Sequence, residues 1–286
     1  MPDGRDTALE SGALDLAPAR KPIARPGARL GGWPVRLLLP LLLPLLVLGG
    51  AELAVRAGVL PAHLMPPPSE IAVTLADLAR NGLFGHVAAS TVRVALGFAG
   101  GATAGIVLGA LVALDRRASR LLDPSLQALR AIPSLAWVPL LLLWFGIDEA
   151  PKLILIGIGA FFPVYTGVTT GFAGVDRKLV EVGLLYRLAP YALVRRVLLP
   201  AALPAILTGL RNGLALAWMF MVAAELIAAS RGLGYLLTDG RETGRADIVL
   251  AAIVLLALLG KGSDMIMVAL EGRLLAWRDT HAGVRG

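Results

Sequence analysis

The chain has 286 residues and a net charge of +7, and 57% of its residues are hydrophobic while only 16% are charged. A soluble domain carries about a quarter charged residues, so this composition excludes an ordinary soluble domain and indicates an integral membrane protein. There is no cysteine and the three histidines are scattered, which excludes disulfides and predicts no metal site. Basic cytoplasmic loops explain the positive charge, so no nucleic-acid partner is expected.

The two ends of the chain differ from its middle. Residues 1–36 are polar and rich in Pro, Gly and Ala, which predicts a disordered cytoplasmic tail rather than a cleaved signal peptide. Residues 279–286 are predicted to be a short cytoplasmic tail. The segment between them, residues 37–278, is predicted to be the transmembrane domain.

Six stretches are long and apolar enough to cross a bilayer, which takes about 20 residues. They are residues 37–55, 88–114, 121–146, 151–174, 202–229 and 247–270. The third is interrupted at Pro133, so its first part is expected to be a separate cytoplasmic-side helix or a kinked start. The sequence therefore predicts an all-α integral membrane protein with about six transmembrane helices.

Small residues and caps predict local structure around these spans. Ser69 follows three prolines and precedes apolar residues at helical spacing, so it is expected to cap a short interfacial helix outside the membrane. Glycines recur every fourth residue in the second span and twice in the fourth, and such stripes let helices approach closely in lipid. These glycines are Gly97, Gly101, Gly105 and Gly109, and Gly167 and Gly171.

The basic residues predict the orientation. With the N-terminus inside, cytoplasmic segments hold seventeen Lys and Arg residues against six outside, so both termini are expected in the cytoplasm. The loop after the fourth span is then cytoplasmic. Residues 175–187, with Asp176 as cap, and residues 189–199 are predicted to be two short helices meeting at Pro190. They form either an elbow that docks a soluble partner or an amphipathic connector on the lipid headgroups.

This loop resembles the cytoplasmic signature of ABC-importer inner-membrane permeases: Glu-Ala-Ala, three residues, Gly, nine residues, Ile, any residue, Leu-Pro. The matching positions are Glu181, Gly183, Val197, Leu199 and Pro200. Val182 replaces the first Ala, and Arg187 replaces the Gly where the first helix ends and positive φ is favoured. Further stretches between about residues 65 and 280 resemble the branch that imports aliphatic sulfonates, taurine and nitrate, and aliphatic sulfonate permeases most of all.

The resemblance implies a type I importer permease of the cell inner membrane, acting as a homodimer that translocates a small anion. Two cytoplasmic ATPase subunits would dock on the elbows, and a periplasmic or lipid-anchored binding protein would deliver substrate. The chain has no phosphate-binding G-x-x-x-x-G-K-[ST] motif. It is therefore expected to be a non-enzyme without a cofactor of its own, while ATP and Mg²⁺ bind the partner. The alternatives are a polytopic membrane enzyme, which lacks a catalytic constellation here, and a self-contained secondary transporter, which lacks an internal repeat.

Ionisable residues inside spans are functional candidates by default. Arg211, Trp218 and Glu225, all on the fifth span, are assigned to a candidate translocation path. Arg211 either gives the path a positive potential or is held by a backbone carbonyl or a headgroup. Trp218 can also serve packing or the membrane interface. Glu225 either pairs with Arg231 or Arg241 or helps to gate the path.

Other charges have simpler explanations. Lys261 and Asp264 lie three residues apart on one predicted helix and are expected to neutralise each other. Arg93 and Arg130 are expected near span ends, with their side chains snorkelling. The outer loop 229–246 forms either a short gate helix that meets the binding protein or a solvated hairpin.

Overall fold

The computed structural model describes residues 33–277, and no strand occurs among them. Contacts divide the chain into two compact units, Met1–Gly49 and Gly50–Gly286. The helices are α1 (Trp33–Arg56), α2 (Pro68–Arg80), α3 (Leu83–Leu114), α4 (Arg116–Ala131), the 3-10 turn η1 (Ser134–Trp137), α5 (Val138–Phe145), α6 (Glu149–Ala173), α7 (Arg177–Leu185), α8 (Pro190–Leu193), the π turn η2 (Val194–Leu198), α9 (Leu199–Ala228), α10 (Leu233–Glu242) and α11 (Ala246–Leu274). The all-α class predicted from the sequence is confirmed.

Four of the described helical stretches are long and apolar enough to cross a membrane: α3, α6, the stretch from α8 through α9, and α11. A fifth results if α4 and the η1–α5 segment count as one broken span, since they meet at an angle of 90°. The remaining expected span, residues 37–55, lies within α1, whose side chains are described from residue 42 onward. The expected separate first part of the third span is α4, which ends just before Pro133.

The predicted tails fall almost wholly outside the described residues. Only residues 33–36 of the N-terminal tail are described, and they belong to α1 instead of a disordered segment. The C-terminal tail, residues 279–286, lies outside the described part.

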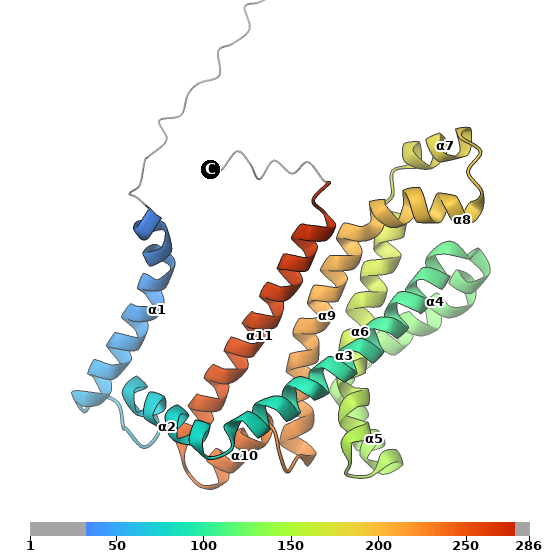
Figure 1. Cartoon of the computed structure of the whole chain (residues 1–286). Coiled ribbons are helices and arrows are strands. Elements are labelled where there is room, and N and C mark those ends of the chain that lie inside the picture. The colour runs from blue at the N-terminus through green and yellow to red at the C-terminus, as the bar shows by residue number, and fades with distance from the viewer. Residues whose placement is uncertain (1–32, 278–286) are drawn as a thin grey trace, which may run out of the picture. The chain divides into compact units, whose positions relative to one another are not determined.

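Helices α3, α6 and α9 pack side by side through their glycines (Figure 1). A Cβ placed on Gly101 would overlap the backbone carbonyl of Gly157 on α6, and one on Gly167 would lie 2.7 Å from the Cα of Gly209 on α9. Such backbone contact is how helices associate in lipid, where the hydrophobic effect does not drive them together. The predicted small-residue contacts are therefore confirmed.

We expect Gly101→Ala to lower the free energy of unfolding by about 1–3 kcal/mol, because a backbone carbonyl cannot rotate away from the added methyl. Gly100→Ala adds the same methyl where no atom lies within 4 Å, and it should leave stability unchanged or slightly higher. Unfolding with SDS in detergent micelles, followed by tryptophan fluorescence, measures both. Equal stabilities of the two variants would contradict the proposed α3–α6 contact.

The predicted interfacial helix exists as α2, but Ser69 does not cap it. The helix begins one residue earlier, at Pro68, because proline suits the first helical turn and its missing N–H is not needed there. Ser69 instead donates its N–H and its hydroxyl to the Glu52 carboxylate at 3.0 and 2.7 Å. In the middle of α2, the buried Thr74 donates to Asp247 of α11 at 2.7 Å. The Asp247 carboxylate also accepts from Arg245, and this hydrogen bond raises the pKa of the Arg245 guanidinium.

The outer loop 229–246 contains the helix α10 and is not a solvated hairpin. Leu233 and Leu236 are fully or almost fully buried, in one cluster with Leu83, Ile248 and Ala252. Burying these two leucines between α3 and α11 favours a fixed helix over a solvated loop. A role for α10 as a gate remains a prediction.

The second half of the expected elbow differs from the prediction. Residues 189–199 do not form a separate helix that ends before Pro200. Instead α8, the π turn and α9 are continuous from Pro190 to Ile227. Pro200 sits in the first turn of α9, directly after the π turn, where its missing N–H is tolerated. Proline and π turns are both places where helices bend, and Figure 1 shows α8 turning away from the direction of α9.

Candidate functional site

The elbow, residues 175–200, begins with a capped helix and ends its first half in a defined turn. Asp176 accepts from the Lys178 N–H at 2.9 Å and caps α7, as predicted. At the far end the Leu188 N–H donates to the Gly183 carbonyl at 3.2 Å and the Arg187 N–H donates to the Leu184 carbonyl at 2.9 Å. These two bonds make a Schellman motif, whose residue after the cap takes the left-handed conformation.

Arg187 occupies this left-handed position with φ of 51°, and it is the one non-glycine residue with positive φ among residues 33–277. The family signature has glycine there because glycine has no Cβ to clash in this conformation. An L-residue with a side chain pays about 1–2 kcal/mol for it. The substitution noted in the sequence therefore keeps the turn and strains it.

We expect Arg187→Gly to raise the free energy of unfolding by about 1 kcal/mol, since relief of the strained φ is partly offset by the greater freedom of glycine in the unfolded chain. Transport should stay equal or rise. Arg187→Ala removes the charge but keeps the Cβ, so it should not stabilise. SDS unfolding and solute uptake by the assembled complex measure the two effects. Loss of uptake by Arg187→Gly in an assembled complex would mean that the arginine itself makes a required contact.

Gly183 holds the two halves of the elbow together. It is buried, and a Cβ there would collide with the Leu193 side chain and lie 3.5 Å from Val197. Two of the signature positions, Gly183 and Val197, therefore pack against each other across the bend. Sequence spacing had placed both in the motif, but it could not show that they touch.

The exposed face of the elbow offers charged and apolar groups together. Glu181 is more than half exposed and accepts from Arg177 at 2.9 Å, one helical turn away. Large apolar side chains of the elbow are exposed as well: Val182, Leu185, Tyr186, Tyr191 and Leu199. Several exposed apolar side chains on one short segment are typical of a protein interaction site.

A buried charge cluster joins four helices at the other end of α9. Arg93 of α3 donates to Glu225 of α9 at 2.7 Å and to both oxygens of Glu149 of α6 at 2.6 and 2.7 Å. Only 1% of Glu225 and 8% of Arg93 is exposed. The expectation that Glu225 pairs with Arg231 or Arg241 is wrong, and Arg93 does not snorkel. Arg231 contributes its backbone carbonyl, which accepts from Arg93 at 2.6 Å.

The same carboxylate anchors the first turn of α10. Glu225 accepts from Ser90 at 2.8 and 2.9 Å and from the Gly234 N–H at 2.8 Å, while Ser90 accepts from the Leu233 N–H at 2.8 Å. Helix N-termini favour negative charge because their first N–H groups lack partners. A side chain on Gly232, whose φ is 137°, would collide with the Glu225 carboxylate. The sequence contained one indication of this cluster: Ser90 and Arg93 are polar residues three positions apart, and so on one face of an apolar helix.

A second ion pair links α9 to α11. Both Nε and Nη2 of Arg211 donate to Asp264, the latter at 3.0 Å. Lys261 lies 3.4 Å from the same carboxylate, so the expected Lys261–Asp264 pair is present but shared. Trp218, about two helical turns after Arg211 on α9, donates to Ser263 of α11 at 2.9 Å. The Arg211 charge is thus held by a carboxylate, neither by a backbone carbonyl nor by a headgroup.

Comparison with known proteins decides the family. The family of binding-protein-dependent transport system inner membrane components matches residues 101–276. The chain belongs to this family. It is accordingly a multi-pass inner-membrane permease of an ABC importer.

Individual relatives match this permease over most of its length. It is 41% identical to the putative aliphatic sulfonates transport permease protein SsuC of Bacillus subtilis, over 96% of this chain and 98% of that protein. It is 35% identical to the taurine transport system permease protein TauC of Escherichia coli, over 74% and 80%. The inward-facing MetNI methionine ABC transporter shares its fold, with a TM-score of 0.54 at 20% identity over 68% of this chain and 94% of that one.

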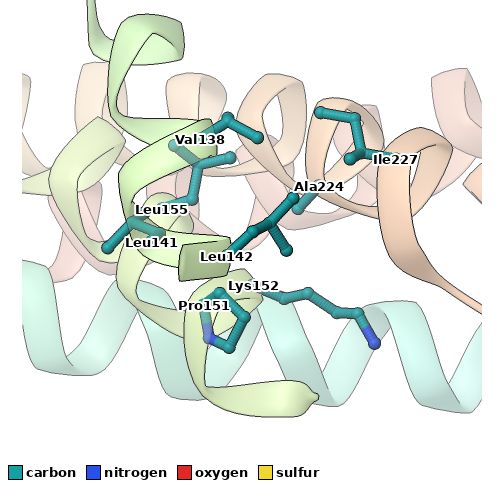
Figure 2. Close-up of a pocket in the computed structure, with 8 residues that line it drawn as sticks. All are labelled: Val138, Leu141, Leu142, Pro151, Lys152, Leu155, Ala224 and Ile227. Carbon is teal, nitrogen blue, oxygen red and sulfur yellow. The ribbon is translucent and has the colours of Figure 1, made fainter. Parts of the chain in front are cut away.

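Two of the hollows among the described residues lie against α6 and α9, and they differ in what they can hold. Figure 2 shows a small apolar cavity lined by α5, α6 and α9 residues, with the Lys152 stem running past it. Its volume of about 20 Å³ suffices for no more than one water molecule, so this cavity does not hold a solute. The Lys152 ammonium reaches Glu149 at 3.1 Å and so belongs to the buried charge cluster.

The larger hollow is an open groove of about 760 Å³ between α6 and α9, with Arg130 and Ser134 at one side. This volume is typical of sites for small molecules. None of the three residues assigned to the path from the sequence lines this groove: Arg211, Trp218 and Glu225 face other helices. Their part in translocation remains a prediction.

Proposed function

We propose that this permease imports an aliphatic sulfonate, a small organic anion, across the inner membrane. The observation that carries the proposal is the 41% identity to a putative aliphatic sulfonate permease along nearly the whole of both chains. Taurine, itself a sulfonate, and nitrate are the other candidates, and relatives that bear these names match less of the chain.

The proposed assembly contains two copies of the permease, with both termini in the cytoplasm, two ATPase subunits and one binding protein. The positive-inside count supports the orientation. No residue in the most apolar stretch of α11 is buried against the rest of the chain. A second copy or lipid would cover this apolar face in the assembly. In this assembly the N-terminal segment, residues 1–36, and the C-terminal segment, residues 279–286, lie in the cytoplasm.

The elbow is the proposed docking site for the ATPase, which binds ATP and Mg²⁺ and performs the hydrolysis. Glu181 and the apolar side chains around it provide the contact, while Gly183, Val197 and the Schellman turn keep its shape. Because α8 runs into α9 without a break, a displacement of the docked elbow is transmitted directly to α9. Discrete shifts between packed helices are the usual way in which such machines switch states.

The binding protein is proposed to meet the opposite end, where α2 and α10 lie (Figure 1). There the first turn of α10 is fixed by Glu225 and Ser90, so the docking surface is rigid. Rigid surfaces lose little conformational entropy when they bind.

Uptake by the reconstituted complex tests the function. The permease is reconstituted in liposomes with the ATPase and the binding protein that co-purify with it, and ATP is enclosed. We expect ATP-dependent uptake of radiolabelled ethanesulfonate that excess sulfonate suppresses and that nitrate and bicarbonate do not. Preferential suppression by nitrate would overturn the sulfonate assignment, and a permease that retains no ATPase partner would overturn the docking proposal.

A further inference from the structure

The groove between α6 and α9 has one charged side chain among the described residues that line it, Arg130 at the end of α4. Arg130 forms no ion pair within residues 33–277, and it donates from Nη1 to the Thr166 hydroxyl at 3.3 Å. Arg93 and Arg211, in contrast, are each matched by carboxylates. The Arg130 side chain is exposed in the groove, so its charge is available to an anionic ligand there.

Polar side chains continue from Arg130 along both walls of the groove. Thr166 of α6 and Thr208 of α9 each stand one residue before a glycine, Gly167 and Gly209, at which the two helices touch. Asn212 follows Thr208 by one helical turn, on the same face. The two rows therefore border the line of closest helix contact, and they face one common space.

The hydrogen-bond donors of this groove suit an oxyanion. Thr166 accepts from Arg130, so its own O–H is free to donate. The Asn212 side chain is exposed in the groove, and its amide supplies two more N–H groups. The Thr208 hydroxyl already donates to the Pro204 carbonyl at 3.0 Å, so it is not counted among the donors for the anion. Guanidinium groups bind anionic oxygens in pairs, and the low dielectric of a membrane protein strengthens this contact.

We propose that Arg130, Thr166 and Asn212 form a transient binding site for the sulfonate group during translocation, with the apolar groove residues Phe162 and Met219 receiving the alkyl chain. This inference rests on the proposed function and moves the path from the charges of α9 to the α6–α9 groove. The same chemistry would bind the phosphate of a lipid headgroup. We expect this site to bind the anion with low affinity, because a transported ion must be released again.

The test measures sulfonate imported per ATP hydrolysed by the complex in liposomes. We expect Arg130→Gln to lower this ratio at least about tenfold, the loss of a hydrogen bond to a charged group, while hydrolysis stimulated by the loaded binding protein persists. Arg130→Lys should lower it several-fold, because an ammonium cannot make the paired contact. Asn212→Leu should lower it less than Arg130→Gln. Arg120→Gln removes the same charge from the exposed part of α4, away from the groove, and should leave the ratio unchanged.

The other outcomes overturn the inference. An unchanged ratio for Arg130→Gln in a complex whose wild type imports ethanesulfonate refutes the site and leaves the proposed function intact. Loss of stimulated hydrolysis together with uptake assigns Arg130 to coupling instead. If the wild type imports no sulfonate, the function and the site fail together. In galactolipid vesicles, which contain no phosphate, the wild type should keep its ratio, and a fall to the level of Arg130→Gln would identify Arg130 as a headgroup anchor.

Discussion

Arg93→Met is expected to lower the free energy of unfolding by about 3–5 kcal/mol, the cost of leaving a buried ionic partner uncompensated. The partner is Glu225, whose side chain is wholly buried and lies 2.7 Å from the guanidinium. Ser90 and the Gly234 N–H would still donate to this carboxylate. The other cation of the cluster, Lys152, is paired with Glu149 and would not replace the lost guanidinium. The first turn of α10 should loosen as a consequence.

SDS unfolding measures the change, and hydrogen exchange of the α10 amides reports the local effect. Arg241→Met is the matched control, because Arg241 lies 3.8 Å from Glu242 in a pair that is about two thirds exposed on both sides. Exposed pairs of this kind contribute at most about 1 kcal/mol. The double variant Arg93→Met/Glu225→Leu should recover part of the loss, since it removes both charges. A double variant less stable than Arg93→Met would contradict the buried-pair argument.

Local patterns predicted the elements of this fold well, because hydropathy and small-residue spacing act within one helix. The glycine stripe of α3 could be recognised from the helical period alone. Its partner α6 is itself one of the predicted apolar spans. The signature loop was recognised from its resemblance to a family pattern, whose residue types and spacing can likewise be read along a single stretch of chain. Its left-handed residue, Arg187, even kept the backbone conformation that the signature requires of glycine.

Ion partners on different helices could not be predicted, because they depend on which helices become neighbours, whereas the Lys261–Asp264 pair within one helix could. Arg93 lies 56 residues from Glu149 and 132 from Glu225, and the helical period says which face a residue occupies but not what it meets. The nearby arginines of the outer loop were the natural choice for Glu225 by proximity in sequence. The fold uses them differently, with the backbone of Arg231 as an acceptor.

Helix boundaries failed where a tertiary contact replaced a local cap. Ser69 has the right side chain to cap α2, but its hydroxyl and its N–H both donate hydrogen bonds to the Glu52 carboxylate. Pro200 has the features of a span start, yet the π turn before it lets the helix continue from α8.

The consequence for transport is mechanical: α9, about 45 Å long at 1.5 Å per residue, joins the elbow at one end to the buried charge cluster at the other.

Glu181→Lys is expected to reduce uptake by the assembled transporter at least about tenfold while leaving the permease folded. Among the residues that the structure describes, Glu181 pairs only with Arg177, in an exposed ion pair, so the loss of this pair should change the free energy of unfolding by no more than about 1 kcal/mol. At the proposed ATPase interface the consequence is larger, because reversing a charge places like charges opposite each other where the partner provides a cation. The rest of the elbow, with Gly183 close to Val197, should keep its packing, because the Glu181 side chain is more than half exposed.

Arg177→Ala separates the two explanations, since it breaks the same ion pair and keeps the Glu181 carboxylate. It should retain most of the uptake, while Glu181→Lys should lose uptake and the stimulation of ATP hydrolysis by the loaded binding protein. Co-purification of the ATPase then shows whether docking or only signal transfer has failed. If both variants lose uptake equally, the ion pair acts through the shape of α7 and not through a contact with the ATPase. If Glu181→Lys transports at the wild-type rate, the elbow does not couple through this carboxylate, and the exposed apolar residues Leu185, Tyr186 and Tyr191 become the docking surface to be tested.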